Sequence, residues 1–446
     1  MSPPAEESRR ASRADGYQWV WLLVLPAGLL FSSGMLTSRN QAPERMAAEM
    51  TETPGGGSPE RVARGRRLAQ RLCASCHLFP EPGIASRYDW AFGILPGKAM
   101  WLGLTPFNHR THPGGERVLA AKVFPAEPVL SRSDWLDLTS YYLATAPVTM
   151  ALAAFPEVSS EEAIPFQVEA IGYSREPDIG AVAIDSGGGV LYVGNAEDGE
   201  LDVFSAGGEQ LVSQTLGRPI VGLAQTTDAI FITSIGTLLP SDIPGGEVTY
   251  LSKPNAANPQ RRAMAQRLMR PADAEVGDLN LDGIPDLVIG ERGHYLGQVT
   301  ALISQGKDDY LATELLGRAG AVRSRIVDVD GDGKPEVLVM MDGGREGLYL
   351  FEVQADGRST SRIIAEPHPA WDFAWFEAAD LDGDGRVDLV TANGGLPADR
   401  RPGSELRDYH GVHFLRGDGA GGFEAAGFIQ LAGAWRLAVA DFDNDG

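Results

Sequence analysis

The sequence predicts a multidomain protein in which an N-terminal membrane anchor precedes a small all-α domain and a larger all-β repeat domain. Three observations predict this order: an uncharged apolar run covers residues 19–35, helical periodicity marks residues 59–145, and an Asp-rich segment recurs about every 50 residues from residue 278 onwards. The 446 residues are enough for two or three domains of about 100–200 residues. We therefore divide the chain into residues 1–36, 37–58, 59–150 and 155–446.

The N-terminal segment has the pattern of a signal anchor. Residues 1–18 are polar and carry Arg9, Arg10 and Arg13, and the apolar run that follows has no charged residue. Extended to Tyr17 and Leu36, the run reaches roughly 20 residues, the length that crosses a bilayer. Arginines before such a run keep the N-terminus in the cytoplasm and direct the rest outward. We expect a protein anchored in the inner membrane with its bulk on the periplasmic or extracytoplasmic side, or a secreted protein if the segment is cleaved.

Residues 37–58 are polar and end in Pro-Gly-Gly-Gly-Ser, which is typical of a flexible linker. The formal net charge of the chain is −22, so nucleic-acid binding through a basic face is not expected.

The predicted all-α domain, residues 59–150, contains the only two cysteines of the chain. Cys73 and Cys76 are followed at once by His77. This Cys-x-x-Cys-His spacing is that of covalent haem c attachment, with two thioether bonds and the histidine as axial iron ligand. A redox Cys pair and half of a zinc site are the alternatives. A zinc site needs two further ligands, and His109 and His112 could complete one only as a mixed, irregularly spaced set. With both thiols bound to haem, no structural disulfide forms.

Two helices are expected to enclose this motif. Ser58, Pro59 and Glu60 form a helix start, and residues 133–143 form a second amphipathic stretch that stops near Pro147. Two terminal helices packed beside a haem are typical of small cytochrome c domains.

The repeat domain, residues 155–446, is predicted to be built of β-strands and to bind calcium. The Asp-rich segments cover residues 278–286, 328–336, 380–388 and 441–446, and the first three precede β-type runs. Oxygen ligands at positions 1, 3, 5 and 9, with Gly at position 6, suit Ca²⁺. An EF-hand is disfavoured because position 12 holds Ile289, Val339 and Thr391 instead of Glu. The predicted calcium ligands are Asp278, Asn280, Asp282 and Asp286; Asp328, Asp330, Asp332 and Glu336; Asp380, Asp382, Asp384 and Asp388; and Asp441, Asp443 and Asp445.

The two domains together resemble a known family, the exported proteins that carry a cytochrome-c-like domain before FG-GAP (VCBS) repeats. The residues that carry the resemblance are 73–82, 89–104 and 124–147, and it continues into the Asp-rich segments. The resemblance implies one covalent haem c and an all-β propeller. Such propellers commonly have about seven blades, and the chain ends inside the fourth Asp-rich segment, so we expect a propeller that is incomplete at the C-terminus. The expected blades start near residues 165, 218, 271, 321 and 371, with a sixth near 434.

The sixth ligand of the haem iron is predicted to be Met100, because a thioether there would support a stable electron carrier. In the family the methionine usually sits two residues earlier, where this chain has Lys98. His112 or His109 follow as candidates, then Lys98, and Met150 is a further competitor.

The predicted function is electron transfer by a mono-haem cytochrome whose calcium-binding propeller docks it to a redox partner protein. The acidic surface favours a basic partner. Two alternatives stay open: a haem oxidoreductase whose propeller binds the substrate, and a calcium-dependent surface binding or adhesion module. No residue is assigned a catalytic role.

Overall fold

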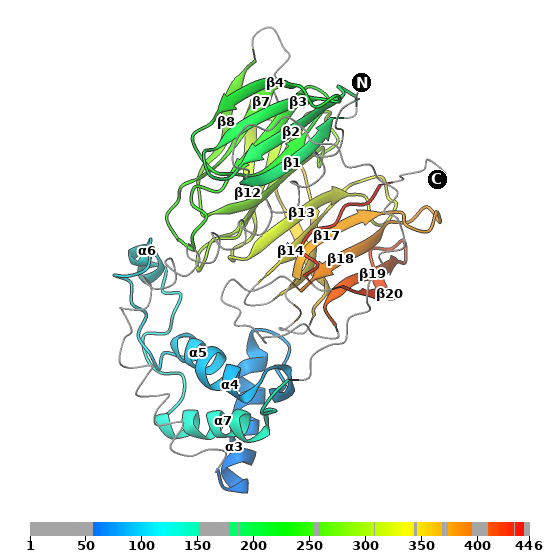
Figure 1. The fold of residues 1–446 in the computed structure, drawn as a ribbon. Coiled ribbons are helices and arrows are strands. Elements are labelled where there is room, and N and C mark those ends of the chain that lie inside the picture. The colour runs from blue at the N-terminus through cyan, green and yellow to red at the C-terminus, as the bar shows by residue number, and fades with distance from the viewer. Residues whose placement is uncertain are drawn as a thin grey trace, which may run out of the picture.

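A helical domain and five four-stranded sheets make up the described part of the chain (Figure 1). The computed structural model describes residues 57–150, 178–253, 259–394 and 409–440, with short gaps at 186, 307, 343–345, 368–370, 372 and 432. The expected anchor, most of the linker, and Asp441, Asp443 and Asp445 lie outside the described residues. Among the described helices none is long and apolar enough to cross a membrane.

The two helices expected at the ends of the helical domain are confirmed. Helix α3 (Pro59–Leu72) starts after Ser58, whose side chain accepts a hydrogen bond from the Arg61 amide, and α7 (Arg132–Thr145) starts after Ser131 in the same way. The two pack along each other. The shorter elements between them are a 3-10 turn (Cys73–Ser75), a second 3-10 turn (Pro82–Ile84), α4 (Arg87–Asp89), a π-helical turn (Trp90–Ile94), α5 (Leu95–Trp101) and α6 (Gly115–Ala120).

The core of this domain fixes the chain that follows the Cys-x-x-Cys-His segment. The Trp90 and Tyr142 rings stack at 3.9 Å and are both buried. Trp90 Nε1 donates to the Pro82 carbonyl at 2.9 Å, and the Tyr142 hydroxyl donates to the Pro80 carbonyl at 3.1 Å. Because buried Trp and Tyr side chains need such partners, the loop after His77 is held against α7.

The sheets are the blades of a β-propeller, each made of four consecutive antiparallel strands. The strands are β1 (Ile179–Asp185), β2 (Val190–Asn195), β3 (Glu200–Ser205), β4 (Gln210–Thr215), β5 (Ile220–Gln225), β6 (Ala229–Ser234), β7 (Gly246–Ser252), β8 (Arg261–Leu268), β9 (Pro271–Gly277), β10 (Asp286–Glu291), β11 (Val299–Gly306), β12 (Asp309–Leu316), β13 (Ala321–Val327), β14 (Glu336–Met341), β15 (Gly347–Val353), β16 (Ser359–Ala365), β17 (Phe373–Ala379), β18 (Asp388–Asn393), β19 (Gly411–Gly417) and β20 (Phe423–Gln430).

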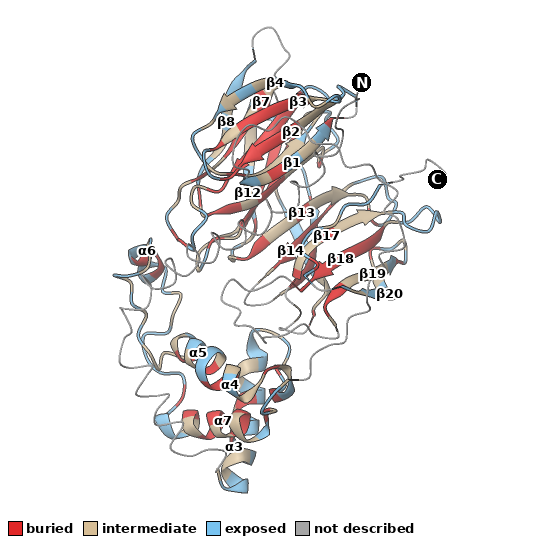
Figure 2. Cartoon of the chain, in the orientation of Figure 1, coloured by how far each residue is buried: buried red, intermediate tan, exposed pale blue. Residues whose placement is uncertain are grey.

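The blades pack through their first strands, since β1, β5, β9, β13 and β17 contact one another in that order. The second strands β6, β10, β14 and β18 are buried along their whole length, while the fourth strands β4, β16 and β20 are mostly exposed (Figure 2). Apolar clusters between the blades therefore form the core, as expected for units that cannot bury both faces alone.

Four of the expected blade starts agree with the structure, at residues 220, 271, 321 and 373. The first described strand is β1, which begins at residue 179, and the blade start expected near residue 165 lies outside the described residues. Residues 433–440 form no strand of the expected sixth blade, and residues 441–446 are not described. The structure thus describes five blades, while the expectation of about seven concerns a complete propeller.

Candidate functional site

The Cys-x-x-Cys-His segment lies where α3 ends. The Cys73 amide still donates to the Ala69 carbonyl of α3, and a single 3-10 turn then carries the chain to Cys76. Cys73 packs partly against the helical core, whereas Cys76 is exposed, and both thiols are free. Burial raises the pKa of the Cys73 thiol. The Ser75 hydroxyl donates to the Leu72 carbonyl at 2.7 Å, which holds the turn that separates the two thiols.

His77 is held in the tautomer that a metal ligand requires. Its Nδ1 lies 2.7 Å from the Leu78 carbonyl oxygen. A carbonyl oxygen only accepts hydrogen bonds, so Nδ1 carries the proton and Nε2 keeps its lone pair. Burial also lowers the pKa of His77, while the charges of Lys98 and Glu366 act on it in opposite directions. The neutral ring with a free Nε2 is the form that binds iron.

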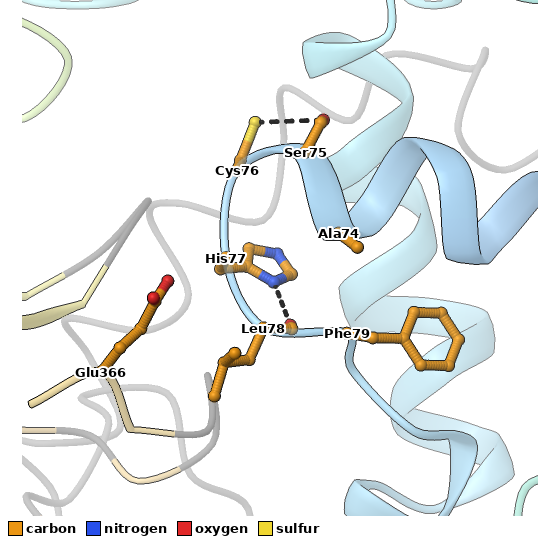
Figure 3. A pocket seen from close by; sticks show the side chains of 7 residues that line it. All are labelled: Ala74, Ser75, Cys76, His77, Leu78, Phe79 and Glu366. Atoms are coloured by element: carbon orange, nitrogen blue, oxygen red, sulfur yellow. Dashed lines mark hydrogen bonds between the residues drawn. The ribbon is translucent and has the colours of Figure 1, made fainter.

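A cavity of about 230 Å³ opens beside this imidazole (Figure 3). Its walls are the consecutive residues Ala74, Ser75, Cys76, His77, Leu78 and Phe79, together with Glu366 from the connection that follows β16. Two free thiols one turn apart and an imidazole with Nε2 unprotonated are the donor set that a covalently bound haem needs. The residues present therefore fit this group.

The structure separates the candidates for the sixth iron ligand. Met100 is half-buried on α5 and is not among the residues that line the cavity. Lys98 lies on the other side of the same helix, since two residues advance a helix by about 200°, and it does not line the cavity either. Its charge acts on both Cys73 and His77, although burial has the larger effect on each pKa.

The two histidine candidates have partners elsewhere. His109 Nε2 lies 3.4 Å from Glu116 within the helical domain, and His112 Nε2 lies 2.6 Å from Asp242 of the propeller. Met150 ends the described part of the helical domain.

The segment that contains His112 joins the helical domain to blades 2 and 3. The buried Asp242, in the β6–β7 loop, accepts hydrogen bonds at Oδ1 from the amides of His294, Tyr295 and Leu296, and its own amide donates to the Pro113 carbonyl at 2.9 Å. A side chain at Gly114 would collide with the Asp242 backbone, so the two chains meet backbone to backbone. The His112 ring stacks on the His294 ring with centroids 5.2 Å apart.

An aromatic cluster extends this contact. Tyr295, in the β10–β11 loop, meets the rings of Trp101, Phe107 and Phe124 with centroid distances of 6.0, 5.5 and 5.0 Å. The edge-to-face geometry of these pairs is the favoured one for aromatic rings. The contact therefore combines a charged hydrogen bond with apolar packing.

The predicted calcium loops connect the first and second strands of blades 3, 4 and 5, as expected for loops that precede a strand. The first Asp of each loop accepts hydrogen bonds from the loop's own amides: Asp278 from Gly283 at 2.8 Å, Asp328 from Gly333 at 2.9 Å and Asp380 from Gly385 at 2.8 Å. The ninth residue of each loop, Asp286, Glu336 or Asp388, starts the next strand and is buried.

Ligand oxygens converge in two of the three loops. Within 4.8 Å of one another lie oxygens of Asp328, Asp330 and Asp332, and likewise of Asp380, Asp382 and Asp388. Carboxylate oxygens are the donors that Ca²⁺ prefers, so both loops fit the ion. In the first loop, Asn280 Nδ2 donates to Asp282 at 3.0 Å, and the Ser304 hydroxyl donates to the same carboxylate.

The repeat units match a known family. Residues 278–339 and 328–391 match the FG-GAP-like repeat. The chain contains an FG-GAP repeat β-propeller. These two matches cover the loops that start at Asp278, Asp328 and Asp380, together with the strands that follow each loop.

Three solved structures are similar to parts of the chain. They are an ancestral GH74 enzyme (15% identity, TM-score 0.39, 56% of this chain and 34% of that one), the Dos1 propeller (8%, 0.36, 54% and 64%) and a protein of unknown function from Bacteroides caccae (14%, 0.32, 54% and 72%). The chain thus spans about a third of the length of the first and under two thirds of the second. No curated protein matches the chain.

Sequence reasoning missed Glu366, Asp242 and Tyr295. Each is a single residue in a connection between strands, without a motif around it, and becomes notable only through its position beside the helical domain.

Proposed function

We propose that the protein is an exported mono-haem cytochrome c that transfers electrons, with its FG-GAP propeller as a calcium-binding docking platform. The observation that carries the proposal is a donor set one turn long: the thiols of Cys73 and Cys76 and the unprotonated Nε2 of His77. Cys76 and His77 line the cavity, and Cys73 packs against the helical core beside it. A haem held there supplies a one-electron donor and acceptor. Cys73 and Cys76 would attach the haem, and His77 Nε2 would supply a nitrogen ligand to its iron.

Met100 is our first candidate for the sixth ligand, and Lys98 is the second. Lys98 ranks ahead of the two histidine candidates because its charge acts on both His77 and Cys73, whereas the histidines have partners elsewhere. If Met100 is the ligand, the Met100→Ala variant should lose the low-spin haem spectrum and the Lys98→Ala variant should keep it. The opposite pattern would identify Lys98 as the ligand.

Calcium binding by the Asp328 and Asp380 loops is proposed on the convergence of their oxygens. Such ions would stiffen the propeller as a surface for a basic redox partner, which the net charge of −22 favours. Residues 19–35 support the proposal of an inner-membrane anchor that holds the protein on the periplasmic side.

Expression in a host that exports the protein and attaches haem c tests the central proposal. The purified wild type should keep haem on a denaturing gel and gain the mass of one haem. The double variant Cys73→Ala, Cys76→Ala should carry no covalently bound haem. His77→Ala should retain covalent haem and lose the axial nitrogen's spectral signature. An exported wild-type protein without covalent haem would refute the proposal.

A further inference from the structure

The cavity beside His77 is shared between the two domains. Six of its described lining residues are consecutive in the helical domain, and the seventh, Glu366, belongs to the propeller (Figure 3). Glu366 directly follows β16 of blade 4 and precedes the buried Pro367, at the start of the connection to blade 5. Its backbone is therefore placed by the propeller, independently of the helical domain.

The contact of the helical domain with blades 2 and 3 brings this carboxylate to the cavity. The β6–β7 and β10–β11 loops that hold His112 and the aromatic cluster connect second to third strands. In an antiparallel blade, these loops emerge on the same face as the connections from one blade to the next. Docking on that face consequently places the Cys-x-x-Cys-His segment over the connection that carries Glu366.

A carboxylate at this place acts on a redox centre through its charge. A ferric haem carries one more positive charge than a ferrous haem, so a fixed negative charge nearby stabilises the oxidised state. The effect is larger where the cavity is partly shielded from water, because the local dielectric constant is lower. Lys98 of the helical domain has the opposite charge and the opposite effect.

We propose that Glu366 of the propeller tunes the cytochrome's reduction potential downward, and that the docking contact between His112 and Asp242 holds the Cys-x-x-Cys-His segment beside this carboxylate. This inference rests on the proposed function. It assigns the propeller a direct part in the redox chemistry, in addition to its role as a docking platform.

A potentiometric titration of the purified holoprotein tests this. Glu366→Gln should increase the equilibrium constant for reduction at least threefold, which corresponds to about 30 mV at 59 mV per tenfold change. Glu352→Gln, an exposed neutralisation on β15 of the same blade, is the matched control and should leave the potential unchanged. Glu366→Asp keeps the negative charge, so its reduction potential should be closer to that of the wild type than the potential of Glu366→Gln.

The docking contact is tested by repeating the measurement in a His112→Ala background, where Glu366→Gln should have less than half of its effect. An unchanged potential in Glu366→Gln would overturn the inference while leaving the proposed function intact. An undiminished effect in the His112→Ala background would overturn the role of the docking contact. Absence of covalent haem in the wild type would refute the proposed function and this inference together.

Discussion

The His112 Nε2 atom lies 2.6 Å from Asp242 Oδ2, and this contact joins the helical domain to the second blade. The Asp242 side chain is fully buried, and its other oxygen accepts three backbone amides from the next blade. The contact is thus a hydrogen bond to a charged and fully oriented acceptor, which is stronger than an exposed ion pair.

We predict that His112→Ala separates the two domains while both stay folded. The variant loses a hydrogen bond to a charged group, worth about 1.5–3 kcal/mol, and its stacking on His294. Small-angle scattering should show a larger radius of gyration, and circular dichroism should show unchanged secondary structure. His109→Ala is the control, because the His109 ring pairs with Glu116 of its own domain, at 3.4 Å. A scattering curve identical to that of the wild type would contradict the prediction.

This contact also marks the limit of what the sequence predicts. The helix starts at Ser58 and Ser131, the blade period and the loops before β10, β14 and β18 depend on neighbours within about ten residues, and these predictions are confirmed. His112 and Asp242 are 130 residues apart, and His77 and Glu366 lie in different domains. Contacts between such pairs depend on how the folded domains dock on each other. A local sequence pattern does not predict this docking. The sequence alone therefore predicts His112 as a candidate iron ligand, whereas the structure pairs it with Asp242.

A second prediction concerns the crossing of α3 and α7. A Cβ added at Gly65 would lie 1.9 Å from the Asp137 carbonyl oxygen and 2.9 Å from Tyr141 Cβ. Gly65→Ala should therefore destabilise the helical domain by about 1–3 kcal/mol or more, because the helices are forced apart. Helix propensity alone would predict the opposite sign, because it favours Ala over Gly by about 1 kcal/mol.

The matched control is Gly97→Ala in α5, where an added Cβ meets nothing within 4 Å. This variant should be as stable as the wild type or more stable. Thermal unfolding followed by far-ultraviolet circular dichroism measures both variants. Equal melting temperatures for Gly65→Ala and Gly97→Ala would show that the close crossing does not exist in solution.

A third prediction concerns pH and the charged network along the first strands of blades 3 to 5. Arg325 on β13 binds Glu275 on β9 at 2.9 Å and also binds Glu377 on β17. Burial raises the pKa of Glu275 to about 8, and the nearby carboxylates of Asp273 and Glu377 act in the same direction against the opposing effect of Arg325. A pKa that is higher by one in the folded protein than in the unfolded chain corresponds to about 1.4 kcal/mol of free energy.

The direction of the pH effect follows from this shift. Between the ordinary pKa of 4.5 and about 8, the folded protein keeps the Glu275 proton that the unfolded chain has lost. The free energy of unfolding should therefore fall as pH rises through this window. Glu275→Gln cannot ionise, so its stability relative to the wild type should increase from about pH 5 to pH 8. Urea unfolding at several pH values measures this, with Glu352→Gln as an exposed control. If the free energies of unfolding of the wild type and Glu275→Gln changed with pH in parallel, the pKa of Glu275 would not be raised in the folded protein.

The last prediction concerns calcium, which should stabilise the propeller without altering the haem. The Asp328 and Asp380 loops connect first to second strands, and in antiparallel blades these loops emerge on the face opposite to the one that docks the helical domain. A chelator should lower the melting temperature of the propeller. The stabilisation lost is about 2.7 kcal/mol for one site when the free ion had been at 100 times its dissociation constant.

Calcium titration calorimetry on single variants locates the sites. Asp328→Asn and Asp380→Asn should each remove one bound ion, because each replaces a carboxylate in a group of converging oxygens. Asp356→Asn, in the exposed turn between β15 and β16, should remove none. The haem spectrum should stay the same in all three variants, since the Asp328 and Asp380 loops lie on the far face. A spectral change on calcium removal would instead show that the two faces communicate through the blades, most directly through β14, which runs from the Asp328 loop toward the face that docks the helical domain.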